Sequence, residues 1–249
     1  MVNIIISGCM GKMGKVVAGV CAARGDVQVA AGVDFAGGVA DFPVYTNIAD
    51  VKEPADVIID FSHPNALYNL LDFAEKKAMP IVLATTGYSD EQTAQIKKAS
   101  ANIPIFFSFN MSLGINLLVE LCKKAATLLG DGFDIEIVEA HHNQKIDAPS
   151  GTAIMLADGI NEALEEEKEL VFDRHTQRKK REKSEIGMHS IRGGTIVGEH
   201  EVIFAGRDEI VTLSHSARSK EVFATGAVSA AAFMADKPAG LYNMKDLVK

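Results

Sequence analysis

The sequence predicts an α/β protein with two domains: a parallel-sheet domain, and a smaller α+β domain with a mixed or antiparallel sheet. Two observations predict this division. Up to about residue 112, short apolar runs alternate with segments of helical periodicity, as in a parallel sheet covered on both faces. From about residue 134, strand-like runs follow one another without intervening helices. We therefore expect the first domain at 1–112 and 220–249, and the second at 113–219.

The chain begins with a strand, a glycine-rich turn and a helix. Residues 2–7 form a short, mainly apolar run, Gly8, Gly11 and Gly14 follow, and helical periodicity runs from Lys15 onward. Such a turn lets backbone N–H groups approach a pyrophosphate at a helix start, as in a Rossmann-type dinucleotide-binding domain. The spacing is G-x-x-G-x-x-G and not the usual G-x-G-x-x-G, so the turn alone is a weak predictor.

An acidic residue follows the second strand. Residues 27–33 form the strand, and Asp34 lies 20 residues after Gly14. A dinucleotide fold places the acid that hydrogen-bonds the adenosine ribose at this distance. Asp34 could instead cap the loop after the strand. We favour the ribose role, because the turn and the acid fit one βαβ unit.

Further units of the same kind continue the first domain. The predicted strands are 56–61, 80–84 and 105–108, and the predicted helices are 64–77 and 89–100. Polar segments, Thr85-Thr86-Gly87 and Phe109-Asn110-Met111-Ser112, follow the last two strands. The carboxyl ends of parallel strands share one edge of a sheet, where ligands bind. We therefore expect the polar segments to line one crevice.

The second half contains one long helix and then mostly strands. The helix is expected at about 114–129, with one apolar face made of Leu117, Leu118, Leu121, Ala125 and Leu128. The later strands are expected at 134–141, 186–192, 195–204 and 209–215. A last helix, at about 220–235, is expected to return to the first domain.

The segment from Glu139 to Ala153 combines proton-transfer groups, a cation and a helix start. His141 and His142 can exchange protons near neutral pH, and Lys145 adds a positive charge. Ser150 is a natural N-cap for the amphipathic run that follows. The unpaired N–H groups of a helix start suit a carboxylate or phosphate. Together these groups predict a site for a small acidic substrate.

Two other interpretations of the two histidines stay open. They could bind a metal together with Asp147, but consecutive strand residues point to opposite faces and no third spaced ligand stands out. One imidazole could also be packed and the other solvated, with no function. Lys145 and the Ser-Gly-Thr helix start favour a substrate site over both.

Composition and charge limit the partners. The chain has 25 basic and 33 acidic residues, a net charge of −8, which disfavours nucleic acid and anionic membrane surfaces. The short basic run 178–183 is expected to be a solvated loop. The three cysteines form no C-x-x-C pair, Met1 leads directly into a strand, and no apolar stretch is long enough to span a bilayer. We therefore expect a cytoplasmic protein with no signal peptide.

With these motifs the chain resembles the 4-hydroxy-tetrahydrodipicolinate reductase (dihydrodipicolinate reductase) family over essentially its whole length. The matching segments are Gly8 to Gly14, Asp60-Phe61-Ser62, Thr85-Thr86-Gly87, Asn110-Met111-Ser112, Glu139 to Ala153, and Arg192-Gly193-Gly194 with Val197-Gly198-Glu199-His200. The resemblance implies hydride transfer from NAD(P)H to a cyclic unsaturated dicarboxylate, with loss of water. The product would be tetrahydrodipicolinate, in diaminopimelate and lysine synthesis.

The resemblance also implies roles for individual residues. His141 would be the general acid or base, and Lys145 the proton donor that works with it. His142, Gly151 and Thr152 would bind the substrate, the last two through a carboxylate. The implied cofactor-binding residues are Gly8, Cys9, Met10, Gly11, Lys12, Met13, Asp34, Ala84, Thr85, Thr86, Ser108, Phe109, Asn110 and Met111. A homotetramer built through the second domain's sheet is implied as well.

Departures from the family pattern concern the cofactor. Ala84 stands where the family often has glycine, and Ser108-Phe109 where small residues or proline are common, and either could alter how the nicotinamide end is held. Phe35 stands where an arginine would bind an adenosine 2′-phosphate, which Asp34 would repel. We therefore expect NADH to be preferred, and Lys12 to let NADPH be accepted too.

Two other functions remain open from the sequence. Another imino- or amino-acid reductase on the same fold would use the same glycine turn, although the segment 149–153 argues against it. A non-catalytic dinucleotide sensor would keep Asp34 but would have no need of His141 and Lys145 at this spacing.

Overall fold

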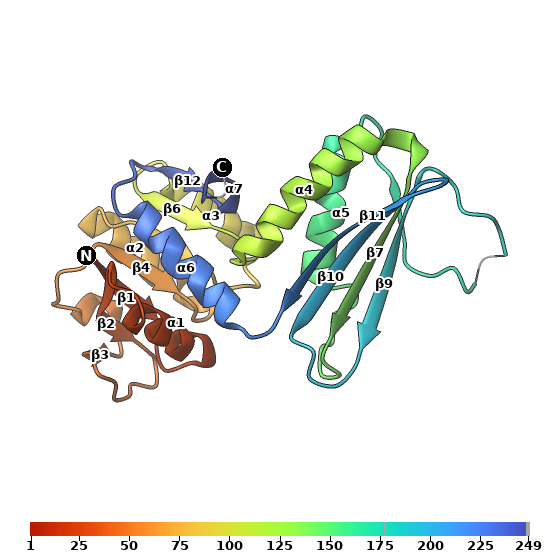
Figure 1. Cartoon of the computed structure of the whole chain (residues 1–249). Coiled ribbons are helices and arrows are strands. Elements are labelled where there is room, and N and C mark those ends of the chain that lie inside the picture. Colours follow the sequence, from red (N-terminus) through yellow and green to blue (C-terminus); the bar gives the residue numbers. More distant parts are fainter. Residues whose placement is uncertain (177, 248–249) are drawn as a thin grey trace. The chain divides into compact units, whose positions relative to one another are not determined.

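The computed structural model describes residues 1–176 and 178–247 (Figure 1). The chain forms two compact units. The first comprises Met1–Leu113 and the described residues from Lys220 onward, and the second comprises Gly114–Ser219. Residues 177, 248 and 249, which the predicted domain ranges include, lie outside the described residues. No helix within the described ranges is long and apolar enough to cross a membrane.

The first unit contains a seven-stranded parallel sheet with the order β12-β6-β5-β4-β1-β2-β3. The strands are β1 Val2–Ser7, β2 Val27–Val33, β3 Val44–Tyr45, β4 Val57–Asp60, β5 Ile81–Leu83, β6 Pro104–Phe107 and β12 Gly240–Tyr242. The strand order reverses at β1, which creates the switch point where Rossmann-type folds bind ligands. The predicted Rossmann-type sheet is therefore confirmed. The short strands β3 and β12 were not predicted, because so few residues carry no periodic signal.

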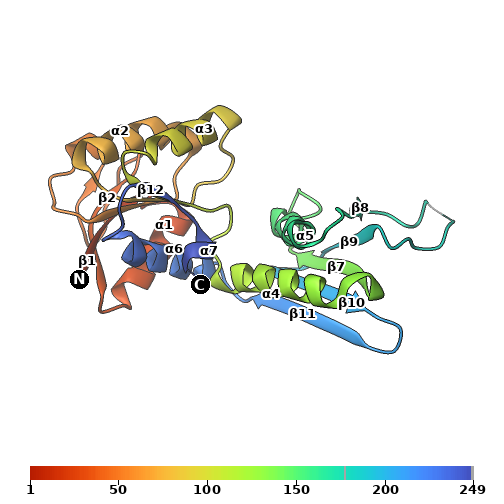
Figure 2. The same cartoon turned by 90° about the horizontal axis from the view of Figure 1, so that it is seen from above.

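Helices cover both faces of this sheet, α1 and α6 on one side and α2 and α3 on the other (Figure 2). Their bounds are α1 Lys12–Ala22, α2 Leu67–Lys77, α3 Asp90–Ala99 and α6 Glu221–Met234, and a short α7 spans Met244–Leu247. Short 3₁₀ turns span Ile48–Asp50 and Pro64–Ala66. Side chains alternate along β1, so Ile4 and Ile6 pack toward α1 and α6 while Ile5 packs toward α2 and α3. Such double burial explains why the strands are continuously apolar.

The second unit is built on a five-stranded mixed sheet with the order β11-β10-β7-β9-β8. Its strands are β7 Asp134–His141, β8 Glu169–Val171, β9 Glu185–Arg192, β10 Gly198–Ala205 and β11 Ile210–Ala217. β10 is antiparallel to β7 and β11, whereas β9 is parallel to β7 and β8. The predicted mixed sheet is confirmed, with β8 as an addition. Helices α4 Leu113–Leu129 and α5 Gly151–Ala163 pack on one face, and a 3₁₀ turn spans Gly130–Gly132.

The predicted apolar face of α4 was correct at Leu118 and Ala125, which pack in the core, and wrong at its other three residues. The helix buries the stripe Ile115, Leu118, Val119, Cys122 and Ala126, whereas Leu117, Leu121 and Leu128 are exposed in the chain described here. Both stripes follow the 3–4 residue spacing of a helix face. Periodicity therefore identifies two candidate faces, and the packing of α4 on the sheet decides between them.

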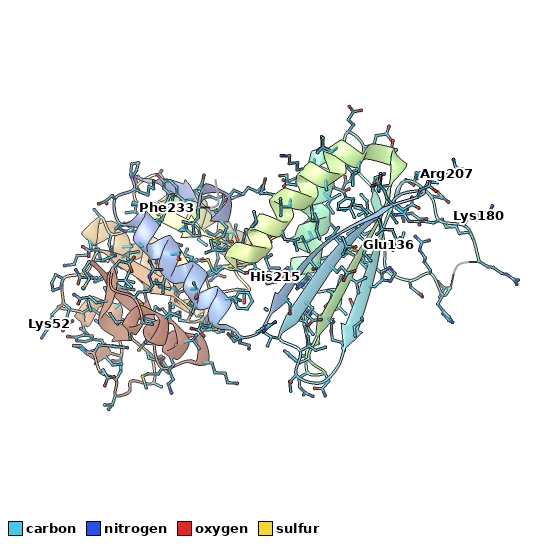
Figure 3. All side chains as sticks on the ribbon, in the orientation of Figure 1. Lys52, Glu136, Lys180, Arg207, His215 and Phe233 are labelled. Carbon is cyan, nitrogen blue, oxygen red and sulfur yellow. The ribbon has the colours of Figure 1, made fainter. Side chains whose placement is uncertain are left out.

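The basic run 178–183 is an exposed loop, as expected, except at Arg181. Arg181 is largely buried and donates to Glu136 Oε1 at 2.8 Å and to Asp134 Oδ1 at 3.1 Å. His189 Nε2 lies 2.8 Å from the second oxygen of Glu136. These contacts form a carboxylate–guanidinium–imidazole cluster, Glu136–Arg181–His189, on the face of the sheet that α4 and α5 leave uncovered. Figure 3 labels Glu136 on this sheet.

Candidate active site

The glycine turn joins β1 to α1 at the switch point of the first sheet. Gly8 has φ of +78°, and a Cβ at Gly14 would lie 2.1 Å from the carbonyl oxygen of Gly8. Gly8 is thus required by its conformation, and Gly14 because α1 packs directly on the turn. Gly11 is the N-cap of α1. The helix's hydrogen bonds begin with Lys15 N–H, which donates to Gly11 O at 3.1 Å. The N–H groups of residues 12–14 precede that bond and can receive an anion.

The side chains of the turn divide between core and surface. A Cβ at Gly32 would lie 2.6 Å from Cys9 Sγ, so this thiol is packed against β2, and burial raises its pKa to about 11. Cys9 can therefore offer a ligand its backbone but not its side chain. Met10 and Met13 are partly buried, and Lys12 is exposed. The ammonium of Lys12 is accessible to a phosphate group.

Asp34 lies beside the glycine turn. Its Oδ2 accepts the N–H of Met10 at 3.0 Å, and its Oδ1 accepts the N–H of Ala36 at 3.2 Å. The loop-capping interaction considered for this residue is thus present. A carboxylate has about four acceptor positions, so this cap leaves capacity for ribose hydroxyls. Phe35 is 95% exposed and brings no cation to this position.

The polar segment after β5 is organised by a buried carboxylate to which the sequence analysis gave no role. Asp60, at the end of β4, is fully buried. It accepts hydrogen bonds from Thr85 Oγ1 at 2.7 Å, from Tyr88 Oη at 3.1 Å and from Ser62 Oγ at 2.5 Å. The Thr85 hydroxyl is therefore engaged within the protein. Ala84 is buried and Thr86 is exposed, so a ligand here would meet mainly the backbone and Thr86.

The segment after β6 also contains both surface residues and a buried residue. Ser108 Oγ donates to Asn110 O at 2.9 Å, and Asn110 Oδ1 accepts the N–H of Ser112 at 2.8 Å. Phe109 is exposed, with its ring edge-on to Phe107 at 5.0 Å between centroids. Met111 is instead buried in the core beside α6. The structure therefore places residues 108–110 at the surface and Met111 behind them.

In the second unit, the helix-covered face of the sheet changes from apolar to polar along the strands. On β7 the same face carries Ile135 and Ile137 in the core and then Glu139 and His141. Neighbouring strands add polar residues at the same level: Ser190 and Arg192 on β9, His200 on β10 and His215 on β11. Figure 3 shows His215 toward one end of these strands and Arg207 at the other. α5 begins at this polar end.

Glu139 links the polar residues. Its carboxylate is 1% exposed. His141 Nδ1 lies 2.5 Å from Oε2, and Arg192 donates to both oxygens, at 2.8 and 2.7 Å. The N–H of Ser150 also reaches Oε1 at 3.2 Å. A buried carboxylate is thus paired with a guanidinium in the bidentate geometry that gives strong charge-assisted hydrogen bonds.

The burial and charges of this group set its protonation. Burial alone raises the pKa of Glu139, but hydrogen bonds from Arg192, Ser190 and His141 outweigh it and bring the pKa to about 2. Burial lowers the pKa of His141, against the opposing effect of Glu139. At neutral pH we therefore expect an ionised Glu139 beside a neutral His141. A carboxylate only accepts, so the imidazole proton lies on Nδ1.

The start of α5 closes the polar end. Ser150 Oγ caps the helix by accepting the N–H of Ala153 at 3.1 Å, and it lies 3.0 Å from His200 Nε2. Burial lowers the pKa of His200 to about 4, and its Nδ1 is buried without a hydrogen-bond partner among the described residues. Gly151 is exposed, and a Cβ there would meet no atom within 4 Å. The first turn of α5 is therefore accessible to an anion.

Lys145 lies in the turn that follows His142, where its N–H bonds to His142 O at 3.1 Å. Its ammonium donates to Asp147 at 2.9 Å and acts electrostatically on His141, whose pKa it lowers. His142 and Thr152 are partly buried. The structure thus brings His141, Lys145 and the start of α5 into one unit. In the described ranges, no group of three or more His, Cys, Asp or Glu side chains is placed to hold a metal ion.

Four polar residues of these sites were missed as candidates: Glu139, Arg192, His200 and Asp60. Glu139 could have been identified, because residues two apart in a strand share a face and it stands two before His141. Arg192 and His200 lie in segments that match the family, but their place beside His141 depends on strand register over more than 50 residues.

The two units have the features of a nucleotide-dependent reductase: a Rossmann-type sheet with a glycine turn, and an imidazole held by a buried carboxylate. Family models described as dihydrodipicolinate reductase, N-terminus and C-terminus, match residues 2–111 and 114–248. The chain belongs to the dihydrodipicolinate reductase family.

Relatives and solved structures agree with this assignment. The chain is 55% identical to 4-hydroxy-tetrahydrodipicolinate reductase of Caldanaerobacter subterraneus subsp. tengcongensis, covering 100% of this chain and 99% of that protein. It is 49% identical to the enzyme of Clostridium tetani, covering 98% and 96%. A dipicolinate-bound dihydrodipicolinate reductase from Paenisporosarcina sp. TG-14 shares the fold, with a TM-score of 0.80, 24% identity, and coverage of 98% and 97%.

The family fixes the reaction. The protein is an NAD(P)H-dependent oxidoreductase that reduces 4-hydroxy-tetrahydrodipicolinate to tetrahydrodipicolinate, a step of diaminopimelate and lysine synthesis. This confirms the reductase predicted from the sequence, over the sensor and over a reductase of another imino acid.

Proposed function

We propose that His141 and Lys145 carry the proton transfer of this reduction. The observation that best supports the proposal is the state of His141. Its Nδ1 is bound to Glu139 at 2.5 Å, and its Nε2 lies so close to Gly198 that a Cβ there would be 3.1 Å away. Within the described residues no hydrogen bond reaches Nε2. An imidazole held at one nitrogen and open at the other is suited to exchange a proton with substrate.

The first unit would hold the nicotinamide dinucleotide, which supplies the hydride when bound. The fit is supported by the accessible N–H groups at the start of α1 and by the position of Asp34 beside the turn. The N–H groups would bind the pyrophosphate and Asp34 the ribose hydroxyls. Further contacts would come from the strand-end segments: Ala84, Thr85 and Thr86 after β5, and Ser108, Phe109, Asn110 and Met111 after β6.

The start of α5 would hold a substrate carboxylate. The N–H groups of Gly151 and Thr152 lie at the positive end of the helix dipole, and His142 would add a further contact. The similar Paenisporosarcina structure is described as dipicolinate bound, and dipicolinate is a cyclic dicarboxylate. That supports a small cyclic dicarboxylate as the substrate class here.

Protonation would follow hydride arrival. The hydride brings negative charge into a conjugated carbon–nitrogen system, and a proton must complete the reduction. Burial keeps the pKa of His141 below its ordinary value, so its Nε2 is an acceptor at neutral pH unless a proton is relayed to it. The Lys145 ammonium would serve as the donor that works with His141. Positioned proton transfer contributes about 10²–10⁴-fold in rate.

The test is His141→Gln. We expect kcat to fall by about 10²–10⁴-fold while NADH still binds, because the substitution leaves the first unit intact. Turnover is followed at the nicotinamide absorbance, with substrate made in situ from pyruvate and aspartate semialdehyde by the preceding synthase. NADH binding is measured separately by fluorescence. Near-normal turnover would remove His141 from the chemistry.

We also propose that NADH is preferred and NADPH accepted. Asp34 would repel a 2′-phosphate, and the exposed Phe35 offers no charge to bind it, whereas Lys12 can still attract it. The ratio of kcat/KM values for the two cofactors decides this. A tenfold preference for NADPH, about 1.4 kcal/mol in the wrong direction, would refute it.

We propose a homotetramer assembled through the second unit's sheet. The face that α4 and α5 leave uncovered presents exposed Ile191 and Ile210, and apolar side chains on a sheet face favour association. Sedimentation equilibrium tests this, since a monomer at micromolar concentration would contradict it. The cytoplasmic location stays a prediction.

A further inference from the structure

We propose that Glu139 and Arg192 are positioning residues that act on His141 in opposite electrical senses. The Glu139 carboxylate holds the Nδ1 proton and thereby presents Nε2 to the substrate. The Arg192 guanidinium neutralises that carboxylate, so that His141 is oriented without becoming a permanent cation. The inference rests on the proposed role of His141 and extends it to the residues behind the imidazole.

The orientation of His141 follows from the strand. Glu139 and His141 stand two apart on β7, so their side chains leave the same face. Nδ1 and Oε2 lie 2.5 Å apart, within hydrogen-bonding distance, and hydrogen bonds to an ionised carboxylate are stronger than those to a neutral acceptor. With Nδ1 committed, the ring directs Nε2 toward Gly198, which has no side chain to cover it.

The orientation of Glu139 is fixed in turn. Both of its oxygens accept from Arg192, and Ser150 N–H adds a bond to Oε1. Arg192 is held by the carbonyl oxygens of Asp147 and Ile191, each at 2.7 Å. The carboxylate therefore has no freedom to rotate away from the imidazole. Hydrogen-bonded supports of this kind fix the tautomer and direction of a functional histidine.

Charged and titratable groups approach His141 from every element around it. Glu139 comes from its own strand, Arg192 from β9, His200 from β10 with His215 beyond it on β11, and Lys145 and Asp147 from the segment before α5. The largest effect on the pKa of His141 is burial, which lowers it, and Glu139 opposes this. Lys145 and Arg192 lower it further. Arg192 thus offsets the charge of the carboxylate it holds.

Two substitutions separate these effects. Glu139→Gln keeps an acceptor for Nδ1–H but removes the negative charge, so the pKa of His141 should fall by about one unit. Arg192→Gln keeps a donor for Glu139 but leaves its charge uncompensated, so the pKa of His141 should rise by about one unit. Shifts of opposite sign distinguish positioning from general damage, which has no reason to produce them.

The experiment titrates histidines labelled at ¹³Cε1 in the full chain by NMR. His141→Gln assigns the His141 signal among the seven histidines. The pH profile of kcat is measured on the same variants, and the limb that reports His141 should move with the NMR value. Glu139→Gln should also lower kcat by about 10²-fold, because the tautomer is no longer held by a charge.

The cluster on the other face supplies a matched control. Glu136 also binds an arginine and a histidine, Arg181 and His189, but points away from His141. Glu136→Gln should leave the His141 titration and kcat unchanged. Arg192→Lys, which keeps the positive charge with fewer donors, should keep the pKa of His141 near the wild-type value. If Arg192→Gln does not fold, Arg192→Lys is the variant of this position that is measured.

The outcomes are distinct. Opposite shifts in the two variants, with none in Glu136→Gln, establish the proposal. No shift in Glu139→Gln, or shifts of the same sign in the two variants, overturn it. A fully active His141→Gln would instead refute the chemical role of His141, while the NMR titration would still report whether Glu139 and Arg192 position the ring.

Discussion

His200 makes the stability of the second unit depend on pH. The side chain is 5% exposed, and burial, with a smaller effect from His141, lowers its pKa from 6.5 to about 4. Between these values the unfolded chain binds a proton that the folded chain does not, so stability falls as the pH falls. The difference, 6.5 minus 4, is about 2.5 units. At about 1.36 kcal/mol per unit, close to 3 kcal/mol of stability is lost by pH 4.

Replacing His200 by Gln removes this titration while keeping a polar side chain opposite Ser150. We expect the variant to lose about 3 kcal/mol less than the wild type between pH 7 and pH 4, although other groups titrate in both proteins. Urea unfolding followed by circular dichroism measures the total. Hydrogen exchange of the β10 amides follows the second unit separately, because the two units need not unfold together.

The control is His175→Gln, which removes an exposed imidazole from the same unit. Between pH 7 and pH 4 this variant should lose as much stability as the wild type. If His200→Gln lost as much stability as the wild type over this range, His200 would not be a buried neutral imidazole and the reasoning would fail.

Three further substitutions test the sites. Gly14→Ala forces a Cβ to within 2.1 Å of a backbone oxygen of the glycine turn. It should weaken NADH binding at least tenfold, about 1.4 kcal/mol. The control Gly19→Ala adds a Cβ in open space on the same helix and should leave NADH binding unchanged. Gly198→Ala places a Cβ 3.1 Å from His141 Nε2 and should lower kcat/KM by about tenfold or more without altering NADH affinity; unchanged kinetics would mean that substrate does not approach this nitrogen. Asp60→Asn exchanges a buried carboxylate oxygen for a donor facing hydroxyls and should cost about 1–3 kcal/mol in thermal unfolding, with weaker NADH binding; a variant as stable as the wild type would show that this network is dispensable.

Local chemistry was enough to predict much of this protein. Short apolar runs between helical segments predicted the parallel sheet, and the order of strands later in the chain predicted the mixed one. The glycine turn followed from the strand and helix around it, because a close helix–turn contact needs glycine. His141, Lys145 and the start of α5 lie within a few residues of one another, so their proximity is largely a property of the chain itself.

Short elements and equivalent faces could not be predicted. The strands β3, β8 and β12 contain two or three residues each, and their pairing depends on neighbours far away in the sequence. On α4 the buried stripe from Ile115 to Ala126 and the exposed residues Leu117, Leu121 and Leu128 follow the same helical spacing. Only the packing of the helix on the sheet decides which one is buried.

The support for His141 was decided by the tertiary structure alone. Arg192 lies 53 residues from Glu139, and strand register between β7 and β9 brings the two together. A shift of one residue would turn the guanidinium to the other face of the sheet. The sequence by itself determined which groups can exchange protons and which turn can bind a dinucleotide. The pairing of strands determined their charge and orientation, because burial and distant partners set the pKa values of Glu139 and His141.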